Sequence, residues 1–386
     1  MARILYVSEG YCTHDRRFLE RMAEMEHEIF FLPCAAASIQ NDLPRVGAPI
    51  RWIPPLIRGE LSSTTRGWLV AAKRFDRLIH KLAPDLIHAG PVQTGGFFAA
   101  LSGFHPLLVM SWGSDVLLTP QKTPALKHIM QFTLRRADAA IADCIAVQRR
   151  ILEFTSLPMN RIFTFPWGVD LHKFQPKPPS LDLRSRLGWR GCKVIVTARA
   201  LEQDYGIRAL LDALKRVLQQ RENIRVVMLG EGRSKDAVES FIKANHLESK
   251  IHLAGRVPEE MLPDYFAEAD LYASAAPCDG SSISLLQAMA CGLPVVVPDN
   301  EGNREWVTDG ENGWLFPARD AKGFAQKLIL ALRDDTARAV AGRVNLKIAL
   351  ERANWQRNSA RISEAYECLL GAKIARRTSG AQLQNR

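Results

Sequence analysis

A run of small and polar residues between Ala273 and Phe316 is the part of the sequence best suited to chemistry. Within it, Asp279-Gly280-Ser281-Ser282-Ile283-Ser284 follows an apolar strand pattern and leads into an apolar helix pattern that ends at Gly292. The first backbone N–H groups of a helix are unpaired and carry partial positive charge, so this turn suits a diphosphate. Gly280 and the serines would let such a ligand approach closely, and Gln287 lies further along the same helix.

The elements that must position this turn begin with a series of short apolar strands in the first half of the chain. The predicted strands are residues 4–7, 28–32, 85–88, 107–110 and 139–142, and helix patterns cover residues 65–82 and 124–136. Strands without polar alternation are buried on both faces, which predicts a parallel sheet with helices on each side.

The second half of the chain repeats this alternation of strands and helices. Its strands are predicted at residues 193–198, 224–229, 251–254, 270–273 and 294–297. A Pro-rich segment, residues 174–180, separates the halves and is interpreted as an interdomain linker, because proline cannot continue a helix.

The sequence therefore predicts an α/β protein with two doubly wound domains, residues 1–172 and 173–354. A closing helix over residues 355–370 precedes a basic tail, residues 371–386, that we expect to be disordered. Ligands of doubly wound domains bind at the carboxyl ends of the strands, so a cleft between the two domains is the expected site.

Composition agrees with two soluble domains. The 386 residues are 47% apolar and 24% charged, which is typical of globular proteins. No apolar run is long enough for a membrane-spanning helix, and the N-terminus lacks the pattern of a signal peptide. The seven cysteines include no CxxC pair, which argues against a disulfide framework or a zinc site. These features indicate a cytoplasmic protein.

The net charge of +10 is unevenly distributed. Residues 45–81 hold eight basic and two acidic residues, with Trp52 and Trp68 among them. A basic, Trp-bearing amphipathic helix suits an anionic membrane surface on the inner face of the membrane, and it equally suits a solvated helix face. No nucleic-acid-binding motif accompanies the charge, so we expect no nucleic-acid partner.

The stretch that starts at Asp279 resembles the signature of the retaining glycosyltransferase family 4, also called glycosyl transferases group 1. The family pattern is an acidic residue, a Glu on the following helix, and then Ala-Met-Ala-x-Gly-x-Pro-Val. Here the corresponding run is Gln287-Ala288-Met289-Ala290-Cys291-Gly292-Leu293-Pro294-Val295. The resemblance implies a nucleotide-sugar donor and the GT-B fold, in which two Rossmann-like domains face a central cleft. It also implies that the closing helix, about residues 355–370, crosses back to the first domain.

The resemblance also implies roles for individual residues. Asp279 would hold hydroxyls of the donor sugar, Gln287 would hold the ribose in place of the usual Glu, and Arg199 would grip the diphosphate. Tyr205 stands where the family has a Lys, and Trp112 stands where it often has a His. The further expected donor-binding residues are Gly10, Gly230, Gly232, Arg256, Val257, Gly280, Ser281, Ser282, Ile283 and Ser284. Asp115 either binds the acceptor or acts as its base, or it caps the helix that follows.

These features predict a retaining glycosyltransferase that moves a sugar from a UDP- or GDP-sugar to a hydroxyl acceptor. A glycan or lipid-linked acceptor in surface polysaccharide or glycolipid synthesis is expected. No Asp-x-Asp motif occurs, so neither a metal nor another cofactor is expected. Two alternatives stay open, and the first rests on the substitutions at Tyr205, Gln287 and Trp112. One is a degenerate GT-B protein that binds nucleotide or glycan without catalysis, and the other is a nucleotide-sugar epimerase.

Overall fold

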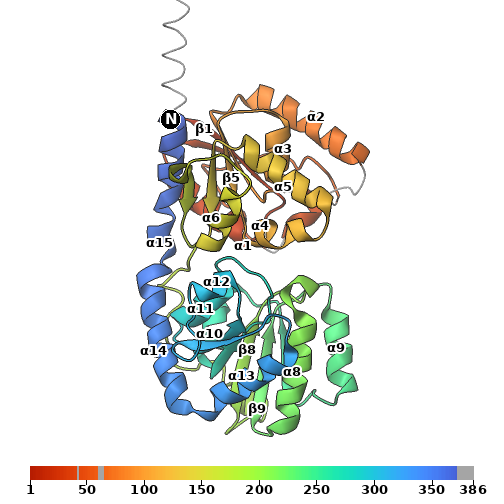
Figure 1. The fold of residues 1–386 in the computed structure, drawn as a ribbon, viewed down its shortest axis with the longest axis vertical. Coiled ribbons are helices and arrows are strands. Elements are labelled where there is room, and N and C mark those ends of the chain that lie inside the picture. The colour runs from red at the N-terminus through yellow and green to blue at the C-terminus, as the bar shows by residue number, and fades with distance from the viewer. Residues whose placement is uncertain (41–42, 60–64, 372–386) are drawn as a thin grey trace, which may run out of the picture. The chain divides into compact units, whose positions relative to one another are not determined.

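The chain forms two compact units, each built on one sheet (Figure 1). The computed structural model describes residues 1–40, 43–59 and 65–371. Unit 1 comprises Met1–Phe165 together with Ser359–Arg386, and unit 2 comprises Pro166–Asn358. Within the described ranges, no helix is both long and apolar enough to cross a bilayer.

Unit 1 contains a parallel sheet of seven strands in the order β3-β2-β1-β4-β5-β6-β7. The strands are β1 (Arg3–Ser8), β2 (Glu28–Pro33), β3 (Arg51–Trp52), β4 (Leu86–Ala89), β5 (Leu107–Met110), β6 (Ala139–Ala142) and β7 (Ile162–Thr164). Every residue of β4, β5 and β6 is buried, as expected for strands covered on both faces. The order changes direction between β1 and β4, so the chain loops away in opposite directions at the carboxyl ends of these two strands.

Helices of unit 1 connect its successive strands. They are α1 (Thr13–Ala23), α2 (Thr65–Leu82), α3 (Gly95–Leu101), α4 (Ser114–Leu117), α5 (Pro124–Arg136) and α6 (Ile145–Leu152). The predicted bounds of α2 and α5 agree with the structure. The two tryptophans of the basic segment pack inward: Trp68 stacks on Phe98 with ring centroids 4.8 Å apart, and Trp52 lies 4.8 Å from Phe31.

Unit 2 contains a parallel sheet of six strands in the order β10-β9-β8-β11-β12-β13. The strands are β8 (Lys193–Ala198), β9 (Ile224–Leu229), β10 (Ile251–Gly255), β11 (Leu271–Ala273), β12 (Val295–Pro298) and β13 (Gly313–Phe316). This is the strand order of a Rossmann fold, with its change of direction between β8 and β11. The predicted class, two doubly wound α/β domains, is confirmed.

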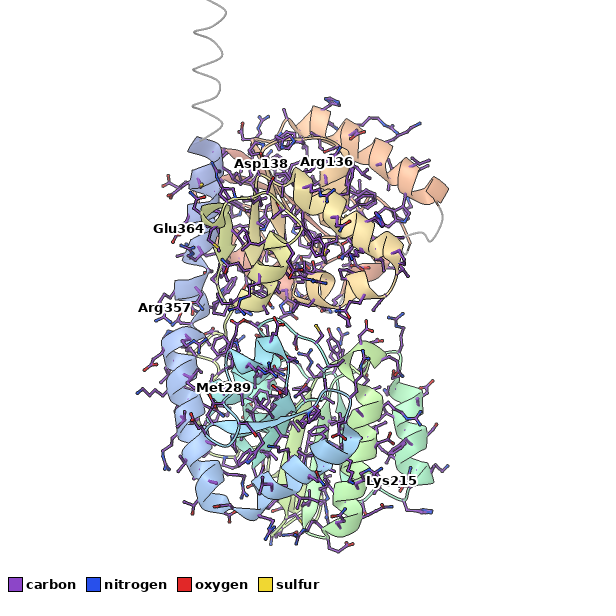
Figure 2. All side chains as sticks on the ribbon, in the orientation of Figure 1. Arg136, Asp138, Lys215, Met289, Arg357 and Glu364 are labelled. Atoms are coloured by element: carbon purple, nitrogen blue, oxygen red, sulfur yellow. The ribbon has the colours of Figure 1, made fainter. Side chains whose placement is uncertain are left out.

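Helices connect the strands of unit 2, and others precede β8 or follow β13. They are α7 (Leu183–Arg186), α8 (Ile207–Gln220), α9 (Lys235–Ala244), α10 (Leu262–Ala267), α11 (Ile283–Ala290), α12 (Glu301–Arg304), α13 (Ala321–Arg333), α14 (Asp335–Arg352) and α15 (Trp355–Asn358). The predicted helix start near Ser282 is observed, since Ser282 is the N-cap of α11. Met289 on this helix is fully buried in the core of unit 2 (Figure 2).

The division between the units falls between Phe165 and Pro166, earlier than the predicted residue 172. The Pro-rich segment that we interpreted as a linker lies within unit 2, where Phe174 is buried and Lys177 pairs with Asp264 at 2.5 Å. The predicted closing helix is interrupted at Ser359: α15 ends at Asn358, and residues 360–371 form a further helix in unit 1. Beyond Gly371, the predicted basic tail lies outside the described residues.

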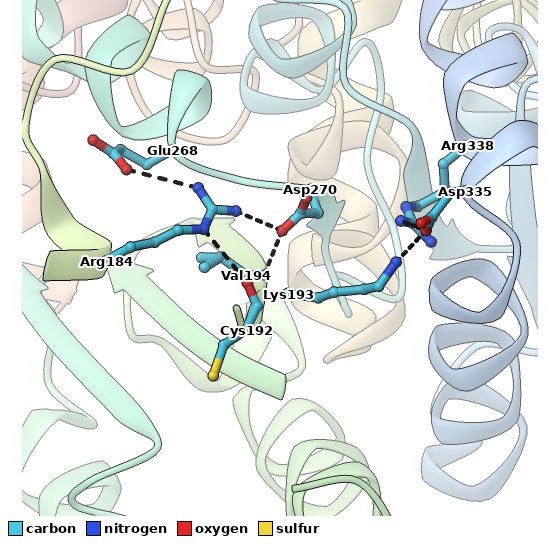
Figure 3. A network of polar contacts seen from close by, with 8 residues as sticks. All are labelled: Arg184, Cys192, Lys193, Val194, Glu268, Asp270, Asp335 and Arg338. Carbon is cyan, nitrogen blue, oxygen red and sulfur yellow. Dashed lines mark hydrogen bonds and ion pairs between the residues drawn. The ribbon is translucent and has the colours of Figure 1, made fainter. Parts of the chain in front are cut away.

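A polar network fastens the amino ends of β8 and β11, away from the ends that carry ligands (Figure 3). Asp270 accepts a hydrogen bond from Val194 N at 2.7 Å and another from Arg184 Nη2 at 2.7 Å. Lys193 and Arg338 both pair with Asp335, which ties β8 to the first turn of α14. The network stabilises the sheet at β8 and β11, the neighbouring strands between which the strand order changes direction.

Candidate active site

Arg199 and Asp279 lie, with several of the predicted donor-binding residues, where the strand order of unit 2 changes direction. Arg199 directly follows β8, and the turn that carries Asp279 and Ser282 follows the neighbouring strand β11. Side chains at the carboxyl ends of adjacent parallel strands lie at one edge of the sheet, which is where doubly wound domains bind ligands.

Arg199 is the centre of this group. Its Nη2 lies 2.7 Å from Asp279 Oδ2, and its Nη1 donates to Ser282 Oγ at 2.9 Å and to Ser284 Oγ at 3.4 Å. The side chains of Arg199 and Asp279 are 15% and 18% exposed. The guanidinium is therefore held in a fixed orientation at the edge of the domain without being sealed off from a ligand.

The ring of Tyr205 supports the guanidinium from one side. Arg199 Cζ lies 4.3 Å from the ring centroid, a cation–π contact. Burial alone would lower the pKa of Arg199, but the carboxylate of Asp279, with the hydroxyls of Tyr205 and Tyr272, raises it instead. The site therefore keeps one permanent positive charge. Tyr205, where the family has Lys, supplies a supporting surface and no second charge.

Two predicted glycines bring backbone segments close to Arg199. Gly230 has φ of +135°, and a Cβ there would collide with the carbonyl oxygen of Arg199. A Cβ at Gly232 would lie 2.5 Å from the carbonyl oxygen of Leu201. These positions require glycine because the loop after β9 packs directly on the backbone that carries Arg199.

The start of α11 closes the other side of the group. Gly280, Ser281, Ser282 and Ser284 are buried, and Ile283 is half-buried. Gln287 is also buried, on the same helix. Arg256 and Val257 follow β10, the strand at the sheet edge; Arg256 is exposed and Val257 is half-buried. Among the described residues, no group of three or more His, Cys, Asp or Glu side chains is arranged to hold a metal ion.

Gly10, Trp112 and Asp115 belong to unit 1. Asp115 is buried, and its carboxylate accepts hydrogen bonds from Val92 N at 2.9 Å, Ser111 Oγ at 2.7 Å and Trp112 N at 2.9 Å. Burial raises the pKa of this carboxyl, and these donors oppose the rise. Asp115 lies within α4, whose N-cap is Gly113 and which has no side-chain cap, so the helix-capping alternative is wrong. The side chain instead joins the loops after β4 and β5.

Trp112 and Gly10 lie at the carboxyl ends of the strands of unit 1. Trp112 is half-buried, and its ring contacts that of His14 edge-on, with centroids 5.7 Å apart. A Cβ at Gly10 would collide with the carbonyl oxygen of Ser38, so the turn after β1 packs against the short helix at Ala36–Ser38. Both residues therefore shape the loops at the carboxyl edge of the unit 1 sheet.

Tyr272 is not among the predicted site residues. This residue lies in the middle of β11, is fully buried, and places its hydroxyl 2.8 Å from Ser284 Oγ. A tyrosine inside an otherwise apolar strand is the signal that could have indicated it, because a buried hydroxyl needs a partner.

Two family models match the chain. The one described as glycosyl transferases group 1 matches residues 182–345, and the one described as glycosyl transferase 4-like matches residues 3–144. The phosphatidyl-myo-inositol mannosyltransferase of Mycolicibacterium smegmatis is 33% identical over 219 residues, which cover 56% of this chain and 54% of the relative. The sulfoquinovosyl transferase of Arabidopsis thaliana is 23% identical over 316 residues, 78% of this chain and 60% of the relative. The chain thus spans about half to three fifths of the length of these relatives.

Solved structures share the fold along nearly the whole chain. Sucrose-phosphate synthase from Thermosynechococcus elongatus superposes with a TM-score of 0.79 at 16% identity, covering 96% of this chain and 100% of that one. The Anabaena protein HepE, in complex with UDP and glucose, gives a TM-score of 0.77 at 18% identity, with coverage of 95% and 100%. These likenesses support the predicted GT-B fold. Matched by family models in both halves, the chain belongs to the glycosyl transferases group 1 family.

Proposed function

We propose that the protein is a retaining glycosyltransferase that moves a sugar from a nucleotide-diphosphate sugar to a hydroxyl acceptor. The observation that carries the proposal is the arrangement of Arg199 beside Asp279 and the start of α11, at the ligand-binding edge of a Rossmann sheet. Arginine has five N–H donors, and its contacts with Ser282, Ser284 and Asp279 leave donors over for phosphate oxygens.

In the proposed reaction, the bond between the sugar's anomeric carbon and the diphosphate oxygen breaks while the acceptor hydroxyl attacks the same face. The acceptor's proton passes to the leaving diphosphate. Negative charge grows on that diphosphate, and Arg199 with the first N–H groups of α11 would stabilise it. Asp279 would accept hydrogen bonds from hydroxyls of the sugar and fix its orientation. The family resemblance supports the retaining stereochemistry.

The relatives guide the choice of donor and acceptor. The names of two mycobacterial relatives specify mannose transfer to phosphatidylinositol lipids, and one of them names GDP-mannose. Solved structures of HepE contain UDP or UDP-glucose. We therefore propose a UDP- or GDP-sugar donor and a glycan or lipid-linked acceptor, in surface polysaccharide or glycolipid synthesis.

We also propose that unit 1 contacts an anionic membrane surface from the cytoplasmic side. Leu69 and Val70 on α2 are 60% and 45% exposed, and the basic side chains of Lys73, Arg77 and Lys81 on the same helix are exposed as well. Apolar side chains beside basic ones suit the interface of an anionic bilayer. Replacement of Leu69 and Val70 by Gln should abolish cosedimentation with phosphatidylglycerol vesicles and leave the unfolding temperature unchanged.

The function is tested by measuring ligand-induced thermal stabilisation with UDP, GDP, ADP and their common sugar conjugates. Stabilisation by one nucleotide and its sugar conjugates is expected, because a ligand that binds only the folded state raises the unfolding temperature. The sugar conjugate that binds then serves as donor in a transfer assay with candidate lipid and glycan acceptors. Absence of any stabilisation at millimolar ligand would contradict the proposal.

A further inference from the structure

Tyr272 connects the interior of unit 2 to the guanidinium of Arg199. Its side chain is fully buried in β11, where its ring packs edge-on against Phe266 with centroids 6.4 Å apart. Its hydroxyl lies 2.8 Å from Ser284 Oγ, and Ser284 Oγ accepts a hydrogen bond from Arg199 Nη1 at 3.4 Å. A continuous chain of polar contacts therefore runs from the sheet to the charged group at the site.

The chemistry of Tyr272, Ser284 and Arg199 gives this series of hydrogen bonds a defined role. Arginine can only donate hydrogen bonds, so Ser284 must present a lone pair to Nη1. A serine hydroxyl rotates freely about its C–O bond unless a second partner fixes it. Tyr272 is that partner, since burial raises the pKa of its phenol and the hydroxyl stays neutral and able to hydrogen-bond. Tyr272 thereby fixes the orientation in which Ser284 meets Arg199.

The other contacts of Arg199 make this support necessary. Ser282 Oγ also accepts from Nη1, at 2.9 Å, and it lies 3.5 Å from Ser284 Oγ. The two hydroxyls therefore share one nitrogen. On the far side, Asp279 draws Nη2 towards itself at 2.7 Å. Without an anchored Ser284, Nη1 would keep Ser282 but lose one of the two hydroxyls that oppose the pull of Asp279 on the guanidinium.

We infer that Tyr272 is a positioning residue for donor binding, which orients Arg199 through Ser284. The inference rests on the proposed function, because it assigns Arg199 to the diphosphate. It predicts that the phenolic oxygen, and not only the ring, contributes to affinity for a nucleoside diphosphate.

The test compares the affinities of UDP and GDP for variants of the full chain, measured by isothermal titration calorimetry. The variants are Tyr272→Phe, Ser284→Ala and the double variant. Tyr366→Phe is the matched control: Tyr366 is also a buried tyrosine, and its hydroxyl makes one hydrogen bond, 2.9 Å long, to His88 Nδ1 in unit 1. Both Tyr→Phe changes remove a buried hydroxyl and its hydrogen bonding, so both should lower the unfolding temperature.

Tyr272→Phe is expected to weaken binding of the nucleotide by about 3- to 10-fold, the range that one hydrogen bond supplies, while Tyr366→Phe leaves the affinity unchanged. Ser284→Ala should weaken binding similarly, and the double variant should lose no more than the weaker-binding single variant, because both changes interrupt one chain.

Wild-type affinity in Tyr272→Phe, equal losses in Tyr272→Phe and Tyr366→Phe, or fully additive losses in the double variant would each overturn the inference while the proposed function stands. Failure of the wild-type chain to bind either nucleotide would instead overturn the proposed function, and the inference with it.

Discussion

Arg199 Nη2 lies 2.7 Å from Asp279 Oδ2, so the residue expected to hold the diphosphate is paired with the residue expected to hold the sugar. The two side chains come from loops that follow adjacent strands, β8 and β11. A donor that reaches Arg199 therefore meets a positive charge that Asp279 already partly neutralises. This pairing leads to opposite predictions for ligands with and without a sugar.

Asp279→Asn should bind UDP or GDP about 2- to 5-fold more tightly than wild type, because the negative charge that competes with the diphosphate is removed. Turnover of the sugar donor should fall by about 10-fold or more, because a carboxylate accepts hydroxyl hydrogen bonds more strongly than an amide does. Calorimetry with the free nucleotide and a transfer assay separate the two effects. Asp309→Asn, which breaks a surface ion pair with Lys327, is the control. Equal weakening of nucleotide and sugar nucleotide would mean that Asp279 acts only by holding Arg199.

Arg199→Ala should lower transfer by about 100-fold or more, since a preorganised donor to developing charge contributes at least this much. Arg199→Lys keeps the charge but cannot reach Ser282 and Asp279 together as the guanidinium fork does, so it should recover only a small part of the activity. The control is Arg233→Ala, because the Arg233 side chain is 93% exposed and pairs with Glu202. Wild-type turnover in Arg199→Ala would remove the basis for the donor site.

Much of the fold could be predicted because buried strands and helices have apolar patterns that can be recognised in the local sequence. The all-apolar runs 107–110 and 139–142 coincide with β5 and β6, and two helices have their predicted bounds. The strands β3, β7 and β13 were not predicted. These are short strands at sheet edges, and each forms by pairing with one neighbouring strand, as Trp52 pairs with Phe31 and Trp314 with Val296. Such partners cannot be recognised from a local pattern.

The candidate site likewise has a part that a local sequence pattern predicts and a part that depends on how distant segments pair. The motif around Asp279 indicated the residues that line the start of α11, since their types and spacing lie in one continuous stretch. The contacts of Arg199 with Ser282 and Ser284 depend on how β8 and β11 pair, which no spacing along the chain specifies. For Asp115 the sequence left two roles open, and the three donors to its carboxylate could be found only in the folded unit.

Gly206→Ala should destabilise unit 2 by about 1–3 kcal/mol and weaken nucleotide binding. Gly206 has φ of +71° at the start of α8, and a Cβ there would collide with the carbonyl oxygen of Ala275, in the loop that leads to Asp279. Gly188→Ala is the matched control, because Gly188 has φ of +67° with nothing within 4 Å of its Cβ position. Thermal unfolding should show the larger loss for Gly206→Ala. Equal losses would mean that backbone strain alone accounts for both, without the collision.

The stability of unit 1 should fall as the pH is lowered, through His88. This side chain is fully buried, and burial lowers its pKa to about 3, whereas in the unfolded chain the pKa is about 6.5. Between these values the unfolded state binds a proton that the folded state does not, so stability is greatest above about pH 6.5 and declines below it. The expected loss is about 1 kcal/mol between pH 6.5 and 5.5, and somewhat more over the next pH unit.

The double variant His88→Phe/Tyr366→Phe isolates this effect. It removes the titrating ring together with the hydroxyl that bonds it, so no hydroxyl is left without a partner. Unfolding temperatures measured from about pH 7.5 to 4.5 should decline less steeply in this variant than in wild type. His80→Gln serves as the control, since His80 is exposed and should leave the wild-type slope unchanged. An identical pH slope in the double variant and in wild type would show that His88 takes up its proton without unfolding unit 1. The contact between β4 and the helix of residues 360–371 would then tolerate a charged imidazole.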